Sequence, residues 1–223
     1  MAWPRQLVLV RHAESEGNVL SVDERAQYDV STHEYKLTVR GREQAKITGA
    51  FLRETYGPFD VRYVSYYTRS KETMKIMYPG TSSVYEDPRL AEAQRGIWHT
   101  MTKDQIDRDF PHESARKERE GLYHYRPIGG ENWPDIELRI HSFLGTLSRD
   151  YAGQNVLMVV HAHWLILFQR LVHRFSIDEA LTRYKAGVIQ NASVTVYGDG
   201  IARGAPGQLQ CVSENFVPWR GKC

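Results

Sequence analysis

The hydrophobic pattern of this 223-residue chain consists of short apolar runs separated by longer amphipathic segments. The run at Val8–Val10 is continuously apolar and Asn155–Val160 is the most apolar segment, which is typical of strands buried on both faces of a sheet. Shorter runs and one alternating segment add further strands. The predicted strands are Val8–Val10, Val61–Ser65, Ser83–Tyr85, Asn155–Val160, Ala192–Tyr197 and Gln208–Val212.

Apolar residues at helical spacing occupy most of the segments between these strands. Thr68 is the predicted N-cap of one helix, and Pro79-Gly80 ends that helix. Residues 19–37 are polar and irregular, and Pro127–Gly130 reads as a tight turn. The predicted helices are 38–57, Arg69–Tyr78, Trp133–Tyr151, Trp164–Phe175 and a highly charged segment at 102–121.

Strands that alternate with helices predict an α/β fold, because each crossover helix covers one face of a parallel sheet. We expect a three-layer α/β/α sandwich with a mainly parallel sheet, formed by residues 1–223 as a single domain. The charged segment interrupts the alternation. It predicts a helical cap at about 99–130, inserted over the functional site of the domain rather than folded as an independent domain.

Composition narrows the class of protein. The net charge of +2 gives no strong field for nucleic acid. No apolar run reaches the ~18–20 residues of a membrane helix, and the first residues lack a signal-peptide core. Both cysteines, Cys211 and Cys223, lie near the C-terminus, so a disulfide framework is not expected. We expect a cytoplasmic protein, and no pattern predicts its oligomeric state.

Polar residues follow the ends of several predicted strands. Arg11-His12 leaves the first strand, Arg69 and Glu92 follow the next two, and His161 ends the most apolar one. Open α/β sheets bind ligands at the carboxyl ends of their strands, so these side chains are expected to meet. An arginine fork suits phosphate oxygens, and a neutral imidazole is a nucleophile. The set therefore favours phosphoryl chemistry.

Each of these residues also has a structural interpretation. Arg-His after a strand is commonly a surface pair, and Arg69 at a helix start could bridge to Glu72. Glu92 alone would be a solvated loop charge, and His161 could be a hydrogen-bonded core histidine. All four interpretations must hold together to replace the chemical one.

The order of these motifs resembles that of the histidine phosphatase superfamily, the phosphoglycerate-mutase-like proteins. The resemblance covers residues 5–197, and the segment after Glu92 is nearest the fructose-2,6-bisphosphatase-like phosphatase branch. Four segments carry it together: Arg11-His12 with Glu14 and Gly17-Asn18, Ser65 with Arg69 and Glu72-Thr73, Leu90 with Glu92, and Val159–His161.

The resemblance implies a metal-independent phosphomonoester hydrolase with no cofactor and a small phosphorylated substrate. It implies that His12 is the nucleophile and becomes a phosphohistidine. Arg11, Arg69 and His161 would hold the phosphoryl oxygens with help from Asn18. Glu92 would protonate the leaving oxygen and then deprotonate water. In this scheme His12 attacks as the neutral imidazole, whereas His161 works best when protonated.

The charged segment offers a second group of cations and aromatic residues. They could form an anion pocket for the substrate, or a solvated helical face with i,i+3 and i,i+4 ion pairs. The residues considered for the pocket are Arg116, Lys117, Arg119, Tyr123 and Arg126.

This chain departs from the fructose-2,6-bisphosphatase branch after the second histidine. Ala162 and Ile166 stand where that branch carries glutamine and arginine, which puts fructose-2,6-bisphosphate itself in doubt. His163 and Trp164 either line the pocket or begin the buried helix.

Three other functions stay open at this point. A mutase would pass the phosphoryl group between positions of one substrate. A binding module would hold phosphate without catalysis. A metal hydrolase would use His12, His161, His163 and Glu92 as ligands, although the neighbouring arginines would repel a cation.

Overall fold

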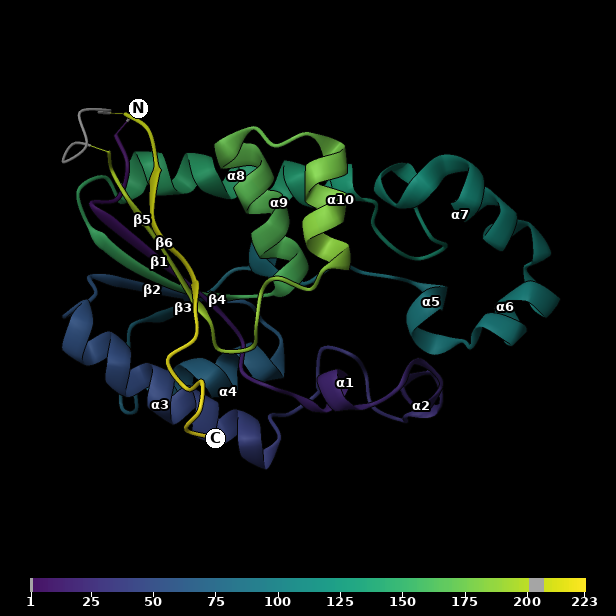
Figure 1. Ribbon diagram of the computed structural model, residues 1–223, viewed down its shortest axis with the longest axis horizontal. Helices are drawn as coiled ribbons and strands as arrows, with labels where there is room; N and C mark the ends of the chain where they lie inside the picture. Colours follow the sequence, from purple (N-terminus) through teal and green to yellow (C-terminus); the bar gives the residue numbers. More distant parts are fainter. Residues whose placement is uncertain (1, 201–206) are drawn as a thin grey trace.

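The computed structural model describes residues 2–200 and 207–223. A six-stranded sheet lies at its centre in the order β3-β2-β4-β1-β5-β6 (Figure 1). β4 pairs in parallel with β1 and β2, and β2 pairs in parallel with β3. β5 pairs antiparallel with both of its neighbours, β1 and β6. The strands are β1 (Gln6–Arg11), β2 (Val61–Val64), β3 (Val84–Glu86), β4 (Asn155–Val160), β5 (Val194–Gly198) and β6 (Gln210–Phe216).

Helices cover both faces of the sheet and complete the expected three-layer α/β/α fold (Figure 1). α3 (Val39–Thr55) and α4 (Thr68–Met77) lie on one face, where a core cluster includes Leu52, Met77 and Val159. α8 (Trp133–Asp150), α9 (Ala162–His173) and α10 (Ile177–Lys185) lie on the other, over a second cluster. The mainly parallel sheet and its two apolar faces are as the sequence predicts.

Residues 97–124 form a helical arm beside the sheet, and Figure 1 shows it extending away beyond α10. It contains α5 (Ile97–Thr100), α6 (Lys103–Asp109) and α7 (Pro111–His124), and α5 packs against α2 (Val22–Gln27). The arm overlaps the expected cap at 99–130. The prediction that residues 1–223 form a single domain with this arm as its cap stays a proposal. The remaining short helices are α1 (Glu16–Val19) and the 3-10 turn η1 (Pro88–Leu90).

Four α-helices of the described chain escape the sequence analysis: the one-turn helices α1 and α5, and the longer α2 and α10, which both begin with a Ser-x-x-Glu capping box. In α2, Ser21 accepts from the backbone of Glu24 while the Glu24 carboxylate accepts from the backbone of Ser21. Ser176 and Glu179 repeat this exchange at the start of α10. The Ser-x-x-Glu spacing was therefore a usable signal in both segments.

Helix starts beside the site also differ from prediction. α4 begins at Thr68 with Tyr67 as its N-cap, because the Tyr67 carbonyl accepts from Ser70 and Lys71. α9 begins at Ala162, directly after β4, so His161 occupies its N-cap position. The predicted turn at 127–130 is confirmed by a hydrogen bond from Gly130 to the carbonyl of Pro127. No helix in the described ranges is long and apolar enough to span a bilayer.

The sheet register sets the position of the site. Arg11 at the end of β1 lies opposite Val160 at the end of β4, so His12 and His161 leave adjacent strands at the same edge. The two imidazole centroids are 5.1 Å apart. Gly41 of α3 lets the loop after β1 pass close to the helix, because a Cβ there would lie 1.9 Å from the carbonyl oxygen of Glu14.

Candidate active site

His12 is held in one tautomer by its neighbours. Its Nδ1 lies 2.7 Å from the carbonyl oxygen of Ala13, which can only accept, so Nδ1 carries the proton. Nε2 therefore has the lone pair, and the Nε of Arg69 donates to it at 3.1 Å. The side chain is 3% exposed. Burial first, and then the charges of Arg69 and Arg11, lower the pKa of His12 well below its usual value.

Arg69 connects the two histidines. Besides His12, its guanidinium contacts Nδ1 of His161 at 3.3 Å and donates to the carbonyl of Thr32 at 2.8 Å. Its Cζ also lies 4.4 Å from the ring centre of Tyr67. Arg69 is 7% exposed, and no carboxylate within residues 2–200 and 207–223 forms an ion pair with it.

The proposed bridge from Arg69 to Glu72 is therefore absent from this part of the chain. Glu72 pairs instead with Arg42 at 3.1 Å and accepts from the backbone of Leu37 at 2.8 Å. Removing a guanidinium from water without a carboxylate partner is unfavourable. A buried cation of this kind suits an anionic ligand.

His161 is fully buried and contacts Arg69 from within the core. Its Nε2 is 2.9 Å from Oγ of Ser65, and its ring packs edge-on against Tyr67 with centroids 4.9 Å apart. Burial, followed by the charges of Arg69 and His12, lowers the pKa of His161 well below its usual value. The structure therefore favours neutral His161, and the protonated state expected from the sequence requires the charge of a bound anion.

Arg11 supplies a second fixed cation beside His12. One terminal nitrogen donates to the carbonyl of Ile189 at 2.7 Å, while its buried Nε has no hydrogen-bond partner in the described chain. Burial lowers the pKa of Arg11 to about 10, with Glu92 opposing and Arg69 adding to this shift. Arg11 stays charged at neutral pH and keeps a donor available.

These residues surround a cavity of about 190 Å³, here named the phosphoryl cavity. Asn18 lines it from α1, and its Oδ1 accepts from Asn191 at 3.1 Å. Sequence reasoning missed Arg25, Arg95 and His99 on the same wall. The lining residues are Arg11, His12, Ser15, Gly17, Asn18, Arg25, Thr32, Tyr35, Arg69, Glu92, Arg95, His99, Ala162, His163 and Tyr184.

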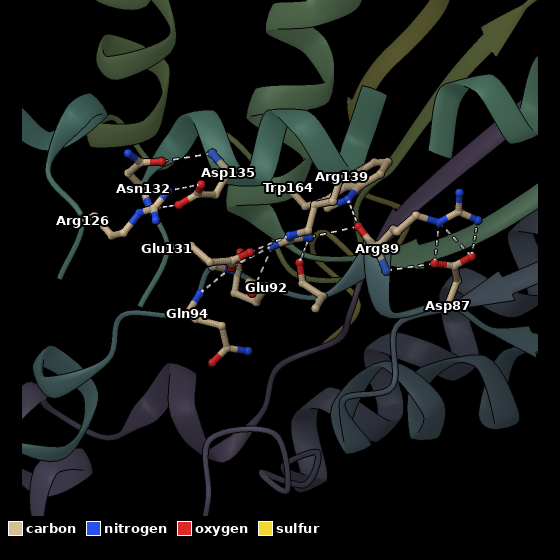
Figure 2. A network of polar contacts seen from close by, with 12 residues as sticks. Asp87, Arg89, Glu92, Gln94, Arg126, Glu131, Asn132, Asp135, Arg139 and Trp164 are labelled. Atoms are coloured by element: carbon tan, nitrogen blue, oxygen red, sulfur yellow. Dashed lines mark hydrogen bonds and ion pairs between the residues drawn. The ribbon is translucent and has the colours of Figure 1, made fainter. Parts of the chain in front are cut away.

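Glu92 reaches the phosphoryl cavity from a segment that is fixed by its backbone carbonyls. Arg139 of α8 donates to the carbonyls of Arg89 at 2.9 Å and Ala91 at 2.7 Å, and more weakly to that of Glu92 at 3.3 Å (Figure 2). Glu131 pairs with Arg139 at 2.9 Å. These contacts hold both sides of the segment that carries Glu92.

Two more contacts, also drawn in Figure 2, fix the segment around Glu92. Together with the contacts of Arg139 they are here named the clamp. The carboxylate of Glu131 accepts from the backbone of Gln94 at 3.1 Å, and the indole of Trp164 donates to the carbonyl of Arg89 at 2.9 Å. Trp164 is buried in the core on the first turn of α9 and does not line the phosphoryl cavity. The signal for Arg139 was its place on the apolar stripe of α8, between Ile136 and Phe143.

The predicted second anion pocket is not assembled as expected. Arg116 pairs with Glu113 at 2.7 Å and Arg126 pairs with Asp135, while the buried Tyr123 donates to Glu137 at 2.9 Å. None of the three lines the phosphoryl cavity. Arg116 pairs at i,i+3 as in the helical ion-pair alternative, whereas Arg126 is neutralised by Asp135, nine residues further along the chain.

Lys117 is the one residue of that group with a different position. Its Nζ lies 3.8 Å above the ring of Trp98. It lines a second cavity of about 360 Å³ next to the phosphoryl cavity.

Comparisons with known proteins point to one family. A family model described as the histidine phosphatase superfamily (branch 1) matches residues 7–201. A 2,3-bisphosphoglycerate-dependent phosphoglycerate mutase from Rhizobium rhizogenes is 29% identical over 182 residues, 78% of this chain and 82% of that protein. A 6-phosphofructo-2-kinase/fructose-2,6-bisphosphatase from Aquarana catesbeiana is 31% identical over 159 residues, 71% of this chain but 30% of that longer protein.

Solved structures show the same relationship. YhfR from Bacillus stearothermophilus superposes with a TM-score of 0.75 at 25% identity, covering 95% of this chain and 97% of that one. The family model spans most of the described sheet and every residue from Arg11 to His161. The chain therefore belongs to branch 1 of the histidine phosphatase superfamily, as its motifs indicate.

Proposed function

We propose that this chain hydrolyses small phosphomonoesters through a phosphohistidine at His12. The observation that carries the proposal is the Nε2 lone pair of His12, which faces Arg69 at 3.1 Å inside a cavity that Arg11 also lines. A phosphoryl group bound there meets a neutral nucleophile and two fixed cations. The cytoplasmic location expected from the sequence stays part of this proposal.

The reaction proceeds in two displacements. In the first, Nε2 of His12 bonds to phosphorus as the bond to the leaving oxygen breaks, and Glu92 gives that oxygen a proton. In the second, Glu92 takes a proton from water, the water oxygen bonds to phosphorus, and the P–N bond breaks. Glu92 ends protonated, ready for the next substrate.

Arg69 has to change partners during substrate binding. Its Nε occupies the lone pair of His12 in this structure, and a phosphoryl oxygen would draw that donor away and release the nucleophile. Arg11 and the side-chain amide of Asn18 would donate to the other oxygens. His161 acts on Arg69 through its 3.3 Å contact, so we assign it a positioning role that becomes direct only if the charge of a bound anion stabilises its protonated form.

A mutase is the second candidate because of the 29% identity to the Rhizobium rhizogenes phosphoglycerate mutase. Such an enzyme would return the phosphoryl group from His12 to its substrate. Assaying phosphate release from 3-phosphoglycerate with and without 2,3-bisphosphoglycerate separates the two. Isomerisation that needs the bisphosphate and releases no phosphate would favour the mutase.

The direct test replaces the nucleophile. His12→Ala is expected to lower kcat for p-nitrophenyl phosphate by about 10³-fold or more, since the covalent route is lost. His141→Ala is the matched control, because His141 is exposed on α8 and does not line the phosphoryl cavity. A His12→Ala protein as fast as the parent would refute the proposal, whereas an inactive parent that still binds phosphorylated ligands would favour the phosphate-binding module.

A further inference from the structure

We propose that the second cavity binds the leaving group, and that it selects a ring that carries an anionic substituent. This inference rests on the proposed phosphatase function and adds a substrate class to it. The cavity, here named the aromatic cavity, has a volume of about 360 Å³. Trp98 and Lys117 of the helical arm line it on one side, and His163 of α9 lines it on another.

The two cavities adjoin each other and share part of their lining. Arg95, His163 and Tyr184 line both the phosphoryl cavity and the aromatic cavity. A phosphoryl group next to His12 therefore directs its ester oxygen and leaving group past these three side chains. Together the cavities fall in the size range of small-molecule sites, whereas a three-carbon leaving group would leave the larger one unfilled.

The walls of the aromatic cavity suit a flat ring. Trp98 is held by a 2.8 Å hydrogen bond from its indole nitrogen to the hydroxyl of Tyr125. Trp133 and Tyr184 pack against His163 at centroid distances of 4.6 and 4.7 Å. Fixed rings of this kind offer apolar faces for stacking or edge contacts. The lining residues are Val22, Ala93, Arg95, Trp98, Met101, Lys103, Lys117, Leu122, Tyr125, Pro127, Glu131, Trp133, His163 and Tyr184.

The charges that face this cavity favour an anion. Arg95 donates to the hydroxyl of Tyr184 at 2.7 Å, and Lys117 lies over Trp98, but neither forms an ion pair in the described chain. The other two charged residues that line this cavity are already paired, Lys103 with Asp107 and Glu131 with Arg139. Two cations therefore remain for a ligand carboxylate or second phosphate.

His163 provides an independent sign of a ligand. It is 5% exposed, and neither ring nitrogen has a hydrogen-bond partner among residues 2–200 and 207–223. Buried polar groups are nearly always hydrogen-bonded, so an unpartnered imidazole between two cavities marks a place for a polar ligand atom. The ester region of a leaving group that passes from one cavity to the other can supply it.

The test compares three alkyl phosphates whose leaving oxygens are chemically similar. For the intact protein, benzyl phosphate is expected to exceed ethyl phosphate in kcat/KM by about tenfold, because only benzyl brings a ring to the aromatic cavity. 4-Carboxybenzyl phosphate is expected to exceed benzyl phosphate by a further ~5-fold at low salt.

Two variants assign these preferences to residues. Trp98→Ala is expected to reduce the benzyl-to-ethyl ratio to within about twofold of unity. Lys117→Met is expected to reduce the carboxybenzyl-to-benzyl ratio by about fivefold. Lys46→Met, on the exposed face of α3, is the matched control and should leave both ratios unchanged. Circular dichroism and the melting temperature establish that each variant is folded.

The outcomes separate this inference from the proposed function. Hydrolysis that depends on His12 but treats ethyl and benzyl phosphates alike would overturn the aromatic cavity as a leaving-group site. A carboxybenzyl preference that survives Lys117→Met would overturn the anionic part. Absence of hydrolysis that depends on His12 for all three esters would overturn the phosphatase function itself.

Discussion

Arg139 is expected to control catalysis without touching substrate. We consider Arg139→Met, which keeps the length and the apolar stem of the side chain and removes its guanidinium. The substitution breaks the ion pair to Glu131 at 2.9 Å and the hydrogen bonds to the carbonyls of Arg89 and Ala91 at 2.9 and 2.7 Å. The backbone that presents Glu92 then loses its support from α8.

The size of the effect follows from burial. The side chains of Arg139 and Glu131 are 15% and 23% exposed, so their ion pair is largely withdrawn from water. Removing one partner from a buried pair costs about 3–5 kcal/mol, and partial exposure places the expected loss in unfolding free energy near 2–3 kcal/mol. A displaced acid forfeits part of the ~10²–10⁴-fold that general acid catalysis supplies.

The assay uses leaving groups that differ in their need for a proton. For ethyl phosphate, whose leaving oxygen is strongly basic, Arg139→Met should lower kcat by about 10²-fold. For p-nitrophenyl phosphate, whose leaving group departs without help, the loss should stay below about tenfold. Arg149→Met is the matched control, because Arg149 is an exposed arginine on the same helix that pairs with Asp150.

Two results would refute this reasoning. Equal losses of kcat for both substrates would show that the substitution damages the site in general rather than the position of Glu92. Full activity of Arg139→Met on ethyl phosphate would show that the segment around Glu92 holds its geometry without the clamp. Glu92→Gln should reproduce the same difference between substrates, with a larger loss.

Three further predictions concern packing, charge and pH. Gly41→Ala should lower the unfolding free energy by about 1–3 kcal/mol in urea titrations, because its Cβ would lie 1.9 Å from the carbonyl oxygen of Glu14; unchanged stability would contradict this close approach. Arg69→Lys should lower kcat by about 10²–10³-fold, since one ammonium cannot replace the planar fork between His12 and His161; a loss under tenfold would argue against that role. Burial lowers the pKa of His163 to about 3, so below pH 6.5 the unfolded chain binds a proton that the folded chain does not; stability should therefore fall from pH 6.5 to 5, and His163→Phe should make that slope shallower by an amount that approaches ~1.4 kcal/mol per pH unit at the acidic end, whereas an unchanged slope would contradict it.

Strands and their ends were the most predictable features. Asn155–Val160 is found as β4 with the predicted bounds, because a run of five buried apolar residues, three of them valine, leaves little choice of structure. Parallel pairing then brings the ends of β1 and β4 together, which places His12 beside His161. These residues are far apart in sequence, and only the sheet rule connects them.

Interactions between distant elements were beyond the sequence. Arg139 reads as one more charge on an amphipathic helix until the turn at 127–130 places Glu131 beside it. Arg116 and Arg126 suggest an anion site by composition, yet Glu113 and Asp135 neutralise them in the fold. Charge counts along a chain give the number of cations, and the fold decides which are left for a ligand.

Phosphoryl transfer to His12 is tested most directly by mixing the enzyme with p-nitrophenyl phosphate and quenching the reaction rapidly without acid. The peptide that contains His12 is then analysed by mass spectrometry. The account predicts a phosphoryl group on His12 within the first turnover, assigned to Nε2 by 31P NMR because Nδ1 is hydrogen-bonded to Ala13. A burst of p-nitrophenol with phosphorus on another residue, or with none bound to the protein, would contradict it.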